Sequence, residues 1–446
     1  MPLALSISGA RGIIGEDITP QIIQNIVCAF HKFIPDGPIL LGRDTRQSGK
    51  AISQIIIGVL KLLGRDVIDA GINPTPTICL CTKELGCAGG IAITASHNPA
   101  QWNGIKLIGP DGLFLPASFW QDFSDNKYDE PVWASFNRIG NETVNVDCPK
   151  IHIDKVLHHP SINVDAIRNF STRVAYDGVG GAGPAIIIPM LERIGIHFDA
   201  IGNNMNGEFI HPPEPIPENL GMLAQLVKET SAQIGFATDP DADRLALVDE
   251  NANSVGEEFT LLLSIYYILS KNKGDIVVNL STTTLVEYLA ENFGVNVFRT
   301  KVGEYWVSKK IAETGAIIGG EGNGGVIIPT IHPVRDAAIA MVSILSLLAE
   351  TGKQLSKIVS EFPKKVMIKD KIERCPEFSQ IAESIVNEFD YIEINTIDGV
   401  WLRTQDGFIH IRPSNTEPII RIIVEGEHTV EVKKIIRKAK SIIKNT

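Results

Sequence analysis

Apolar segments that end in a polar loop and continue into a helical pattern recur three times along the chain. The apolar segments span residues 38–44, 173–178 and 275–283, and the helical patterns that follow them span residues 52–63, 185–194 and 284–293. Strands and helices that alternate in this way are typical of α/β layering, in which helices cover the faces of a sheet. We therefore expect three similar α/β domains with mixed sheets.

The chain after Pro363 follows a different pattern. It predicts a strand, a helix at 378–389, strands at 399–403, 408–412 and 419–425, and a final helix at 430–443. Short consecutive strands beside two helices favour a smaller α+β domain. The predicted boundaries lie near residues 147, 252 and 363. They divide the 446 residues into domains at 1–147, 148–252, 253–363 and 364–446, and a chain of this length has room for four domains.

Charge and composition argue against several classes of protein. The chain has 41 Lys and Arg residues against 52 Asp and Glu residues, a formal net charge of −11, whereas a non-specific nucleic-acid binder needs a basic face. No apolar run reaches the ~18 residues of a membrane span, so segments 259–270 and 337–349 are expected to be buried helices. The N-terminus lacks the pattern of a secretion signal. The six cysteines are sparse, which favours reduced thiols in a cytoplasmic protein.

A Ser-His pair follows a short apolar run at residues 91–93. The run delivers Ser96 and His97 into a loop, and Asn98 and Pro99 are expected to open a helix as N-cap and first helical residue. Such a pair can be turn chemistry, or it can hold a nucleophile if a partner elsewhere in the fold activates the serine. The residues alone leave both alternatives open.

Three carboxylates stand at alternate positions in Asp239, Asp241 and Asp243. Carboxylate oxygens at this spacing can converge on Mg²⁺ or Ca²⁺, and without a cation they repel one another. An EF-hand loop would need glycine where this chain has Arg244, and residues 245–248 continue as a strand. The pattern therefore predicts a tight metal-binding loop between two strands.

Two glycine-rich segments offer further sites. Residues 178–183 match the Gly-x-Gly-x-x-Gly fingerprint after a predicted strand, and Asp199 lies where a ribose-binding acid is expected, so an NAD-dependent oxidoreductase is an alternative. In residues 319–325, Glu321 and Asn323 can bind vicinal hydroxyls of a sugar, unless the segment is a plain β-turn.

A last polar cluster lies between residues 412 and 421. Two guanidinium groups, hydroxyls and loop amides within ten residues can cradle a phosphate. The alternative is a capped turn with surface ion pairs. The candidate phosphate-binding residues are Arg412, Ser414, Asn415, Thr416 and Arg421.

Taken together and in this order, these segments resemble the α-D-phosphohexomutase superfamily over almost the whole chain. The matching segments are Ser8-Gly-Ala-Arg11-Gly, Thr94-Ala-Ser-His-Asn-Pro99, Asp239-Pro-Asp-Ala-Asp-Arg244, Gly320-Glu-Gly-Asn-Gly-Gly325 and Arg412-Pro-Ser-Asn-Thr-Glu-Pro418. The resemblance implies three similar α/β domains and a smaller C-terminal domain around a central cleft. It also implies that residues 178–183 are a structural turn.

The resemblance implies a role for each motif. Ser96 would be carried as phosphoserine and would pass its phosphoryl group to a sugar monophosphate through a bound 1,6-bisphosphate, which also serves as activator. Mg²⁺ would be held by Ser96, Asp239, Asp241 and Asp243, with Arg11 and Arg244 adding positive charge and His97 orienting the phosphoryl group. Lys106 would be the general acid/base, with a pKa lowered by neighbouring cations and burial.

The sugar-binding residues that the resemblance implies are Glu321, Asn323 and, on a substrate-contacting loop, Lys301. Many members carry Ser and His where this chain has Asn323 and Gly325. His332 and the pair Arg335 and Asp336 follow soon after and are expected to fill the role of that Ser and His. The segments look most like the phosphoglucosamine mutase branch, which implies interconversion of glucosamine 6-phosphate and glucosamine 1-phosphate by a monomer or homodimer. The alternatives are a dual-specificity phosphomannomutase/phosphoglucomutase and a non-catalytic phosphosugar-binding relative.

Overall fold

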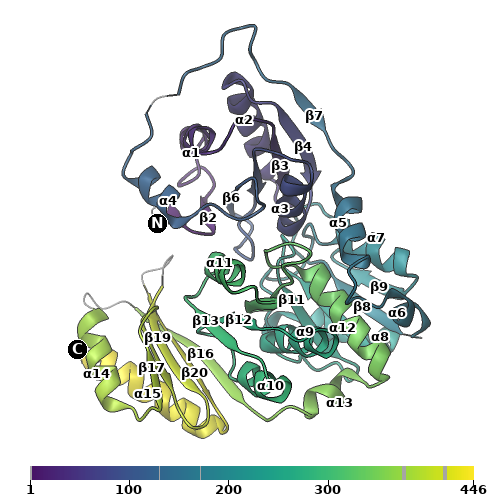
Figure 1. Ribbon diagram of the computed structural model, residues 1–446, viewed down its shortest axis with the longest axis vertical. Coiled ribbons are helices and arrows are strands. Elements are labelled where there is room, and N and C mark those ends of the chain that lie inside the picture. The colour runs from purple at the N-terminus through teal and green to yellow at the C-terminus, as the bar shows by residue number, and fades with distance from the viewer. Residues whose placement is uncertain (1–2, 130, 171, 374–377, 415–418, 446) are drawn as a thin grey trace.

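Four sheet-based domains follow one another along the chain in the computed structural model, which describes residues 3–129, 131–170, 172–373, 378–414 and 419–445 (Figure 1). The first domain contains a seven-stranded sheet with the order β1-β2-β6-β5-β3-β4-β7. Strands β5, β3, β4 and β7 pair in parallel, and β6, β2 and β1 extend the sheet by antiparallel pairing. The elements of this domain are β1 (Ala4–Ser6), β2 (Gly9–Ile13), α1 (Pro20–Phe33), β3 (Ile39–Arg43), α2 (Gly49–Leu62), β4 (Val67–Ile72), α3 (Thr75–Glu84), β5 (Gly89–Ile93), β6 (Trp102–Ile108), α4 (Ala117–Ser124) and β7 (Glu142–Val144).

The second and third domains repeat the central part of this sheet. Their strand orders are β9-β8-β10-β11 and β13-β12-β14-β15, equivalent to β4-β3-β5-β6 of the first domain. In each domain three strands run parallel and the last is antiparallel. The second domain contains α5 (Cys148–Leu157), α6 (Val164–Asn169), β8 (Arg173–Asp177), α7 (Pro184–Ile194), β9 (His197–Ile201), η1 (Pro217–Asn219), α8 (Gly221–Thr230), β10 (Ile234–Thr238) and β11 (Leu245–Asp249). The third contains α9 (Glu257–Lys271), β12 (Ile276–Asn279), α10 (Leu285–Phe293), β13 (Val297–Thr300), α11 (Glu304–Thr314), β14 (Ile318–Glu321), β15 (Gly325–Ile327), α12 (Ala337–Thr351) and α13 (Leu355–Ser360).

The C-terminal domain is built differently. Its five-stranded sheet, in the order β16-β20-β19-β18-β17, is antiparallel throughout. Its elements are β16 (Val366–Glu373), α14 (Phe378–Glu388), β17 (Glu393–Asn395), β18 (Val400–Arg403), β19 (Phe408–Pro413), β20 (Ile419–Gly426) and α15 (Thr429–Asn445). The four sheets confirm the predicted fold class of three similar α/β domains and a smaller α+β domain. The predicted boundaries near residues 147, 252 and 363 stay a proposal.

One apolar core runs through the second and third domains, and the first and fourth domains have cores of their own. Helices α9 and α12 lie in the shared core, as expected for segments 259–270 and 337–349. The residues of α12 are apolar around almost its whole circumference, which is typical of a helix covered on all sides. The shared core fixes residues 239–243 of the second domain relative to the third domain.

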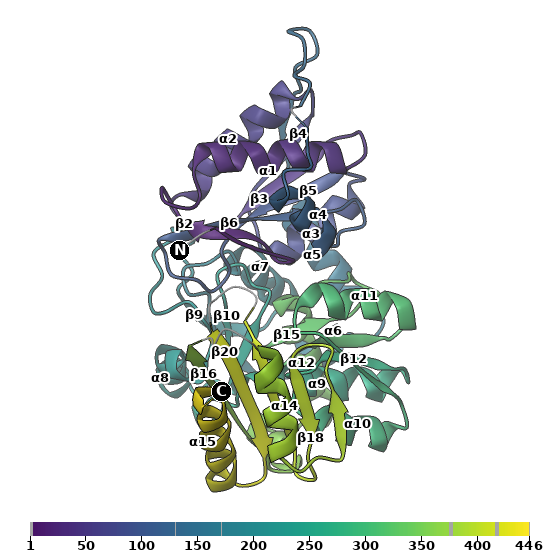
Figure 2. The same ribbon diagram turned by 90° about the vertical axis from the view of Figure 1, so that its left-hand side faces the viewer.

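The C-terminal domain packs on the third domain at a smaller interface. Leu280 of the third domain meets Trp401, Phe408 and Ile423 of the fourth. Beside this contact, the buried Glu425 accepts a hydrogen bond of 3.0 Å from the backbone amide of Thr284. Figure 2 shows the C-terminal domain beside the third domain and below the first. Among the described residues, no helix has both the length and the apolar character needed to cross a bilayer.

Candidate active site

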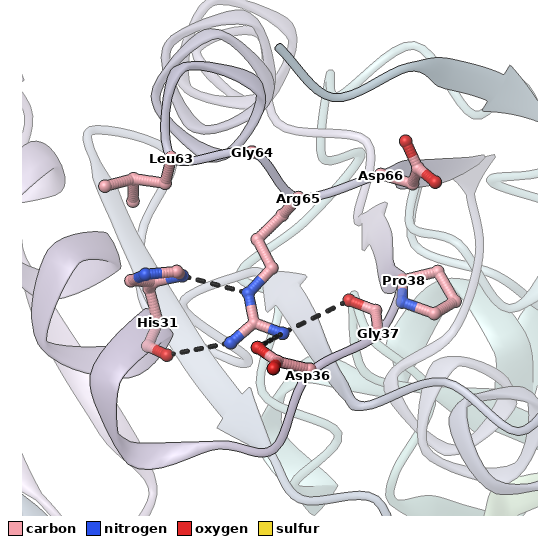
Figure 3. Close-up of a pocket in the computed structure, with 8 residues that line it drawn as sticks. All are labelled: His31, Asp36, Gly37, Pro38, Leu63, Gly64, Arg65 and Asp66. Carbon is pink, nitrogen blue, oxygen red and sulfur yellow. Dashed lines mark hydrogen bonds and ion pairs between the residues drawn. The ribbon is translucent and has the colours of Figure 1, made fainter. Parts of the chain in front are cut away.

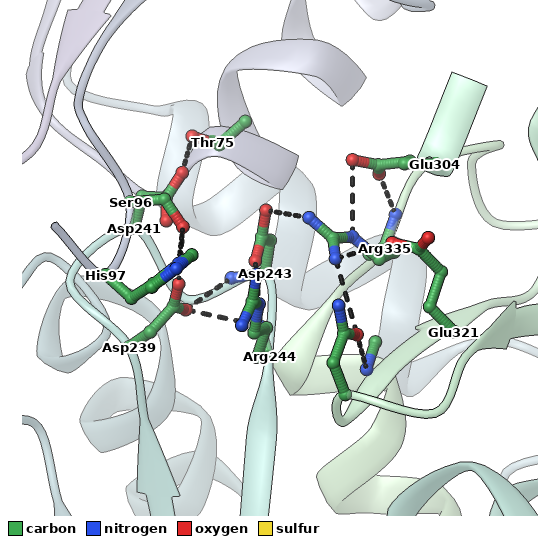
Figure 4. Close-up of polar contacts among 12 residues, drawn as sticks. Thr75, Ser96, His97, Asp239, Asp241, Asp243, Arg244, Glu304, Glu321 and Arg335 are labelled. Atoms are coloured by element: carbon green, nitrogen blue, oxygen red, sulfur yellow. Dashed lines mark hydrogen bonds and ion pairs between the residues drawn. The ribbon is translucent and has the colours of Figure 1, made fainter. Parts of the chain in front are cut away.

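The equivalent loop of each α/β domain carries polar residues. It follows the third strand of the parallel set and leads into the antiparallel strand: Ser96 lies between β5 and β6, and Asp239, Asp241 and Asp243 lie between β10 and β11. In the third domain Glu321 ends β14 and Asn323 precedes β15. Loops at the carboxyl ends of parallel strands are where α/β sheets bind ligands. The loop of the second domain lies between the other two and contacts both, so the three repeated domains each supply one loop to a common site (Figure 4).

The loop of Ser96 is held by Arg46, which follows β3. The Arg46 guanidinium donates hydrogen bonds of 2.6 Å to the carbonyl oxygens of Ser96, Asn98 and Pro99, and one of 3.0 Å to that of Trp102. Its Nε pairs with the buried Asp44 at 3.1 Å. The predicted helix at Asn98 and Pro99 is wrong: β6 begins at Trp102. The carbonyl groups that a first helical turn would use are instead taken up by Arg46.

Ser96 itself has a φ of 50°, a left-handed conformation that is uncommon for a residue with a side chain and that marks functional turns. Its amide donates to Thr94 Oγ1 at 2.9 Å, and the Thr94 hydroxyl donates to Asp44 at 2.6 Å. The Ser96 hydroxyl donates to Asp239 Oδ2 at 2.9 Å and lies 3.3 Å from His97 Nδ1. Burial and the positive charges of Arg244 and Arg11 hold the pKa of His97 well below its ordinary value.

The three aspartates form the predicted tight loop between two antiparallel strands, β10 and β11. All three side chains are buried, and their ligand atoms lie within 4.8 Å of one another. Burial and the neighbouring Asp243 and Asp241 raise the pKa of Asp239 well above its ordinary value. In the part of the chain that the structure describes, Asp241 Oδ1 and Asp243 Oδ1 are buried acceptors without a hydrogen-bond partner. Free carboxylate oxygens in this arrangement fit a hard divalent cation.

Lys106, on β6, reaches the metal-binding loop from the first domain. Its ammonium group is 2.6 Å from Asp241 Oδ2 and 3.5 Å from Asp243 Oδ2, and the Thr75 hydroxyl donates to the same Asp241 oxygen at 2.6 Å. Burial disfavours the charged lysine, but Asp241 and Asp243 outweigh burial and raise its pKa. The expectation of a lowered pKa is therefore wrong for this arrangement, because the neighbours of Lys106 are chiefly acids.

Arg335, which precedes α12, joins the metal-binding loop to the third domain (Figure 4). Its guanidinium donates to Asp243 Oδ2 at 2.7 Å and to Glu321 Oε2 at 2.8 Å, and it lies 3.3 Å from Glu304 Oε2. The Asn323 side-chain oxygen is 3.4 Å from the same guanidinium. The two predicted sugar-binding residues, Glu321 and Asn323, are thus brought together with the metal-binding loop.

Residues 301–304 connect this cluster to the C-terminal domain. The Gly303 amide donates to Glu321 Oε1 at 2.9 Å, and the Val302 amide donates to Asp398 Oδ2 at 2.9 Å. Asp398 also accepts from Arg412 Nε at 3.0 Å. The exposed Lys301 ammonium lies 5.4 Å from the centre of the Trp306 ring.

The predicted phosphate-binding segment is the connection between β19 and β20. Arg412 and Arg421 are direct partners across these two strands. The Ser414 amide donates to the Ile419 carbonyl oxygen at 2.9 Å. Asn415 and Thr416 lie outside the described residues.

The two predicted arginines lie beside Ser96. Arg11, on β2, donates to Asn98 Oδ1 at 3.4 Å, and its Nε is a buried donor without a partner among the described residues. The Arg244 amide donates to Asp239 Oδ1 at 3.2 Å, and its guanidinium is 3.5 Å from Glu214 Oε1. Both guanidinium groups add positive charge next to the Ser96 loop.

His332 is not brought to the sugar-binding loop. It is buried, and its Nε2 lies 2.9 Å from Asp336 Oδ2, which is also 2.7 Å from His152 Nε2. We therefore leave His332 out of the proposed sugar-binding set. The NAD alternative also loses its acid, because Asp199 forms an ion pair of 2.6 Å with Arg173.

Three residues of the site had no role assigned from the sequence: Arg46, Thr75 and Glu304. Arg46 and Thr75 follow the strands β3 and β4 at the same edge of the sheet as Ser96. A search for polar residues after every parallel strand would have singled out these two. Glu304 opens α11 four residues after the parallel strand β13, so the same search would have reached it.

Comparisons with known proteins agree with this architecture. Four models describing domains I, II, III and the C-terminal domain of phosphoglucomutase/phosphomannomutase match residues 4–125, 150–254, 256–366 and 365–439. A Thermococcus kodakarensis protein named phosphoglucomutase/phosphomannomutase is 35% identical over 431 residues, covering 94% of this chain and 93% of the relative. A Methanopyrus kandleri protein named probable phosphoglucosamine mutase is 32% identical over 438 residues, covering 96% of this chain and 95% of the relative.

A solved structure extends the comparison to the fold. A phosphoglucomutase/phosphomannomutase family protein from Burkholderia thailandensis superposes with a TM-score of 0.84 at 23% identity, covering 98% of this chain and 96% of the other. All four domains, in the same order, are therefore matched in sequence, and the whole fold is matched in structure. The chain belongs to the phosphoglucomutase/phosphomannomutase family of phosphohexomutases.

Proposed function

We propose that this protein interconverts a sugar 6-phosphate and a sugar 1-phosphate through a phosphoserine at Ser96 and a bound 1,6-bisphosphate. The observation that carries the proposal is the place of the Ser96 hydroxyl, 2.9 Å from Asp239 in a buried loop of three carboxylates. Phosphoryl transfer depends on positioning and on neutralisation of charge more than on covalent chemistry by the protein. A hydroxyl held among carboxylates and arginines supports that chemistry.

The residues that would hold Mg²⁺ are Ser96, Asp239, Asp241 and Asp243. The free oxygens of Asp241 and Asp243 support this assignment. When bound, Mg²⁺ would supply positive charge to the phosphoryl group on Ser96. Arg11 and Arg244 add fixed positive charge next to the Ser96 loop, and His97, 3.3 Å from the Ser96 hydroxyl, orients the group.

Each half-reaction forms one bond to phosphorus and breaks another. The oxygen of a sugar hydroxyl bonds to the phosphorus, and the bond from phosphorus to Ser96 Oγ breaks, with its electron pair staying on the serine oxygen. We assign Lys106, whose ammonium group lies 2.6 Å from Asp241 on the same loop that contacts Ser96, as the acid toward Ser96 Oγ. The proton lost by the sugar hydroxyl returns Lys106 to its charged form. The second half-reaction runs the same exchange in reverse at the other end of the sugar.

Glucosamine phosphate is the substrate that we propose. The name of the Methanopyrus kandleri relative supports this choice. Glu321 and Asn323 would accept hydrogen bonds from the sugar hydroxyls, Lys301 would contact the substrate, and Arg412, Ser414, Asn415, Thr416 and Arg421 would hold its non-reacting phosphate. The name of the Thermococcus kodakarensis relative favours a second candidate, activity on glucose and mannose phosphates. We expect a monomer or homodimer that acts in the cytoplasm.

Intact-mass measurement tests the phosphoserine. Purified protein incubated with glucose 1,6-bisphosphate should gain one phosphoryl group, and incubation with a sugar monophosphate should remove it. Ser96→Ala should never gain the group. Ser343→Ala should behave like the wild type, because Ser343 is a buried serine on α12 outside the site. The proposal would be refuted if the wild type took up no phosphoryl group, or if Ser96→Ala took up as much as the wild type.

A substrate panel tests the choice of sugar. The 1-phosphates of glucosamine, glucose and mannose are compared with Mg²⁺ and a trace of the matching 1,6-bisphosphate. We expect the highest kcat/KM for glucosamine 1-phosphate. A higher kcat/KM for glucose or mannose 1-phosphate would establish the second candidate and leave the phosphoserine mechanism in place.

A further inference from the structure

We propose that Arg335 is a positioning residue, which holds the metal-binding loop and the sugar-binding loop in one fixed arrangement. The inference rests on the proposed function, because it concerns the same site. Arg335 donates to Asp243 of the metal-binding loop and to Glu321 of the sugar-binding loop, at 2.7 and 2.8 Å. The two loops belong to different domains, and Arg335 contacts a carboxylate of each. The backbone amide of Leu245, which directly follows the metal-binding loop, also donates to the Gly324 carbonyl oxygen at 3.0 Å.

The geometry of Arg335 is specific to an arginine. Three carboxylates from three segments surround its guanidinium: Asp243, Glu321 and Glu304. The Arg335 amide also donates to Glu304 Oε1 at 2.5 Å, so the backbone and the side chain are anchored together. A planar guanidinium can bridge separate carboxylates, whereas the ammonium of a lysine acts as a point charge. With only 8% of its side chain exposed, Arg335 has little freedom to leave this arrangement.

The chain makes room for this side chain at Gly325. A Cβ atom at residue 325 would lie 2.2 Å from Arg335 Cδ. Gly325 follows directly from the sugar-binding loop, at the start of β15. The glycine therefore lets the stem of Arg335 pass beside the loop and reach both carboxylates.

Arg335 acts through its partners. Glu321 Oε1 already accepts from Asn279 Nδ2 at 2.8 Å and from the Gly303 amide at 2.9 Å. With Arg335 on Oε2, the carboxylate of Glu321 is held from both sides, and one lone pair of Oε2 remains for a sugar hydroxyl. On the other arm, Arg335 takes Oδ2 of Asp243. Oδ1 has no hydrogen-bond partner among the described residues and lies 3.8 Å from Arg244 Nε. The acceptors that the proposed function needs are thus left available and fixed in direction.

The test compares Arg335→Met and Arg335→Lys with a matched control. Arg65→Met removes another buried arginine, which contacts the His31 side chain and backbone carbonyl oxygens in the first domain, away from the site (Figure 3). We expect kcat to fall at least 100-fold in Arg335→Met and at least 10-fold in Arg335→Lys, with Arg65→Met within threefold of the wild type for the folded protein. Turnover of the sugar phosphates by the wild type tests the proposed function independently of the role of Arg335.

A binding measurement provides a readout that does not need turnover. In a Ser96→Ala background, calorimetry with glucosamine 6-phosphate should show at least 10-fold weaker binding when Arg335→Met is added, and no change when Arg65→Met is added. A double-mutant cycle tests whether Arg335 affects binding through Glu321. Arg335→Met should cost much less binding in a Glu321→Gln chain than in a chain with Glu321 intact.

Each outcome decides the inference. If Arg335→Lys keeps kcat and binding within threefold of the wild type, bridging by a planar group is not needed and the proposal is wrong. If Arg335→Met and Glu321→Gln have additive effects on binding, Arg335 does not act through Glu321. Should Arg335→Met fail to fold, the Arg335→Lys variant carries the same test. An inactive wild type whose sugar-phosphate binding still depends on Arg335 would refute the proposed function alone.

Discussion

Arg46 offers the most direct test of how the Ser96 loop is built. All five N–H groups of its guanidinium have acceptors: four loop carbonyl contacts and the carboxylate of Asp44. Arg46→Met keeps an unbranched apolar stem and removes every one of these donors. Asp44, which is 1% exposed, then keeps the Thr94 hydroxyl and the amide of residue 46 but loses its ion partner.

The expected loss of stability follows from the buried contacts. Water can replace the guanidinium at the part-buried carbonyl oxygens of Asn98, Pro99 and Trp102, so these bonds add little to the cost. The cost therefore comes mainly from the lost hydrogen bond to the buried Ser96 carbonyl and from the broken ion pair with Asp44. Removing one partner of a buried pair costs roughly 3–5 kcal/mol. A cost of about 4 kcal/mol corresponds to a fall in Tm of roughly 8–16 °C for a domain of ~150 residues.

Thermal melting followed by circular dichroism measures the stability, and intact-mass analysis measures phosphoryl uptake at Ser96. Arg46→Met should lower both, because the left-handed turn at Ser96 loses the group that holds its carbonyl. Arg65→Met should lower Tm through similar carbonyl contacts in the same domain while phosphoryl uptake by the folded protein persists. A Tm within about 2 °C of the wild type, or unchanged phosphoryl uptake in Arg46→Met, would refute the reasoning.

Three further predictions concern the loops and cores around the site. Chelation of divalent cations should abolish turnover but leave the far-UV circular dichroism spectrum unchanged, because Lys106 and Arg335 already pair with Asp241 and Asp243; a cooperative loss of secondary structure on chelation would contradict this. Gly104→Ala places a Cβ 2.6 Å from the Ala10 carbonyl oxygen and should lower the free energy of unfolding by roughly 1–3 kcal/mol, measured by urea unfolding. Gly58→Ala is the control: Gly58 lies on helix α2, a Cβ there would meet no atom within 4 Å, and the variant should not destabilise the protein. Burial alone would raise the pKa of Asp336, but His152 and His332 lower this pKa. The charged Asp336 therefore stabilises the folded state above the ordinary carboxyl pKa of about 3.9, and this stabilisation is lost as the pH falls below that value. Asp336→Ala should therefore lower the free energy of unfolding by roughly 3–5 kcal/mol at pH 7. The difference in Tm between variant and wild type should become smaller below about pH 4. A Tm difference that stays constant down to pH 3 would contradict this assignment.

Local periodicity predicted the elements that have a regular apolar pattern. The segment at residues 284–293 became α10, and the segment at 337–349 became α12, because each carries enough apolar residues to define its own buried face. β17 escaped prediction, since its three residues lie at the edge of the C-terminal sheet and show no buried apolar pattern. The helix expected at Asn98 failed because Arg46, fifty-two residues away, takes its carbonyl groups.

The site residues also divide into those that a local pattern predicts and those that depend on distant contacts. The spacing of Asp239, Asp241 and Asp243 within one turn is local, and it predicted the loop between β10 and β11. The electrostatics of Lys106 depend on Asp241, 135 residues away, and no local pattern announces that contact. The contacts of Arg335 likewise become visible only when the second and third domains are placed together. The sequence therefore indicates which groups carry charge, and the tertiary structure decides which of them neutralise one another.

The order in which the partners of the metal-binding loop are made has a consequence during synthesis. Domains of a long chain fold in turn as they leave the ribosome. Thr75 and Lys106 precede Asp241, so this acid finds its partners already present when the second domain folds. Asp243 waits for Arg335, which is translated 92 residues later. A nascent chain that ends between these two residues lacks the arginine that pairs with Asp243, and release of the third domain completes this ion pair.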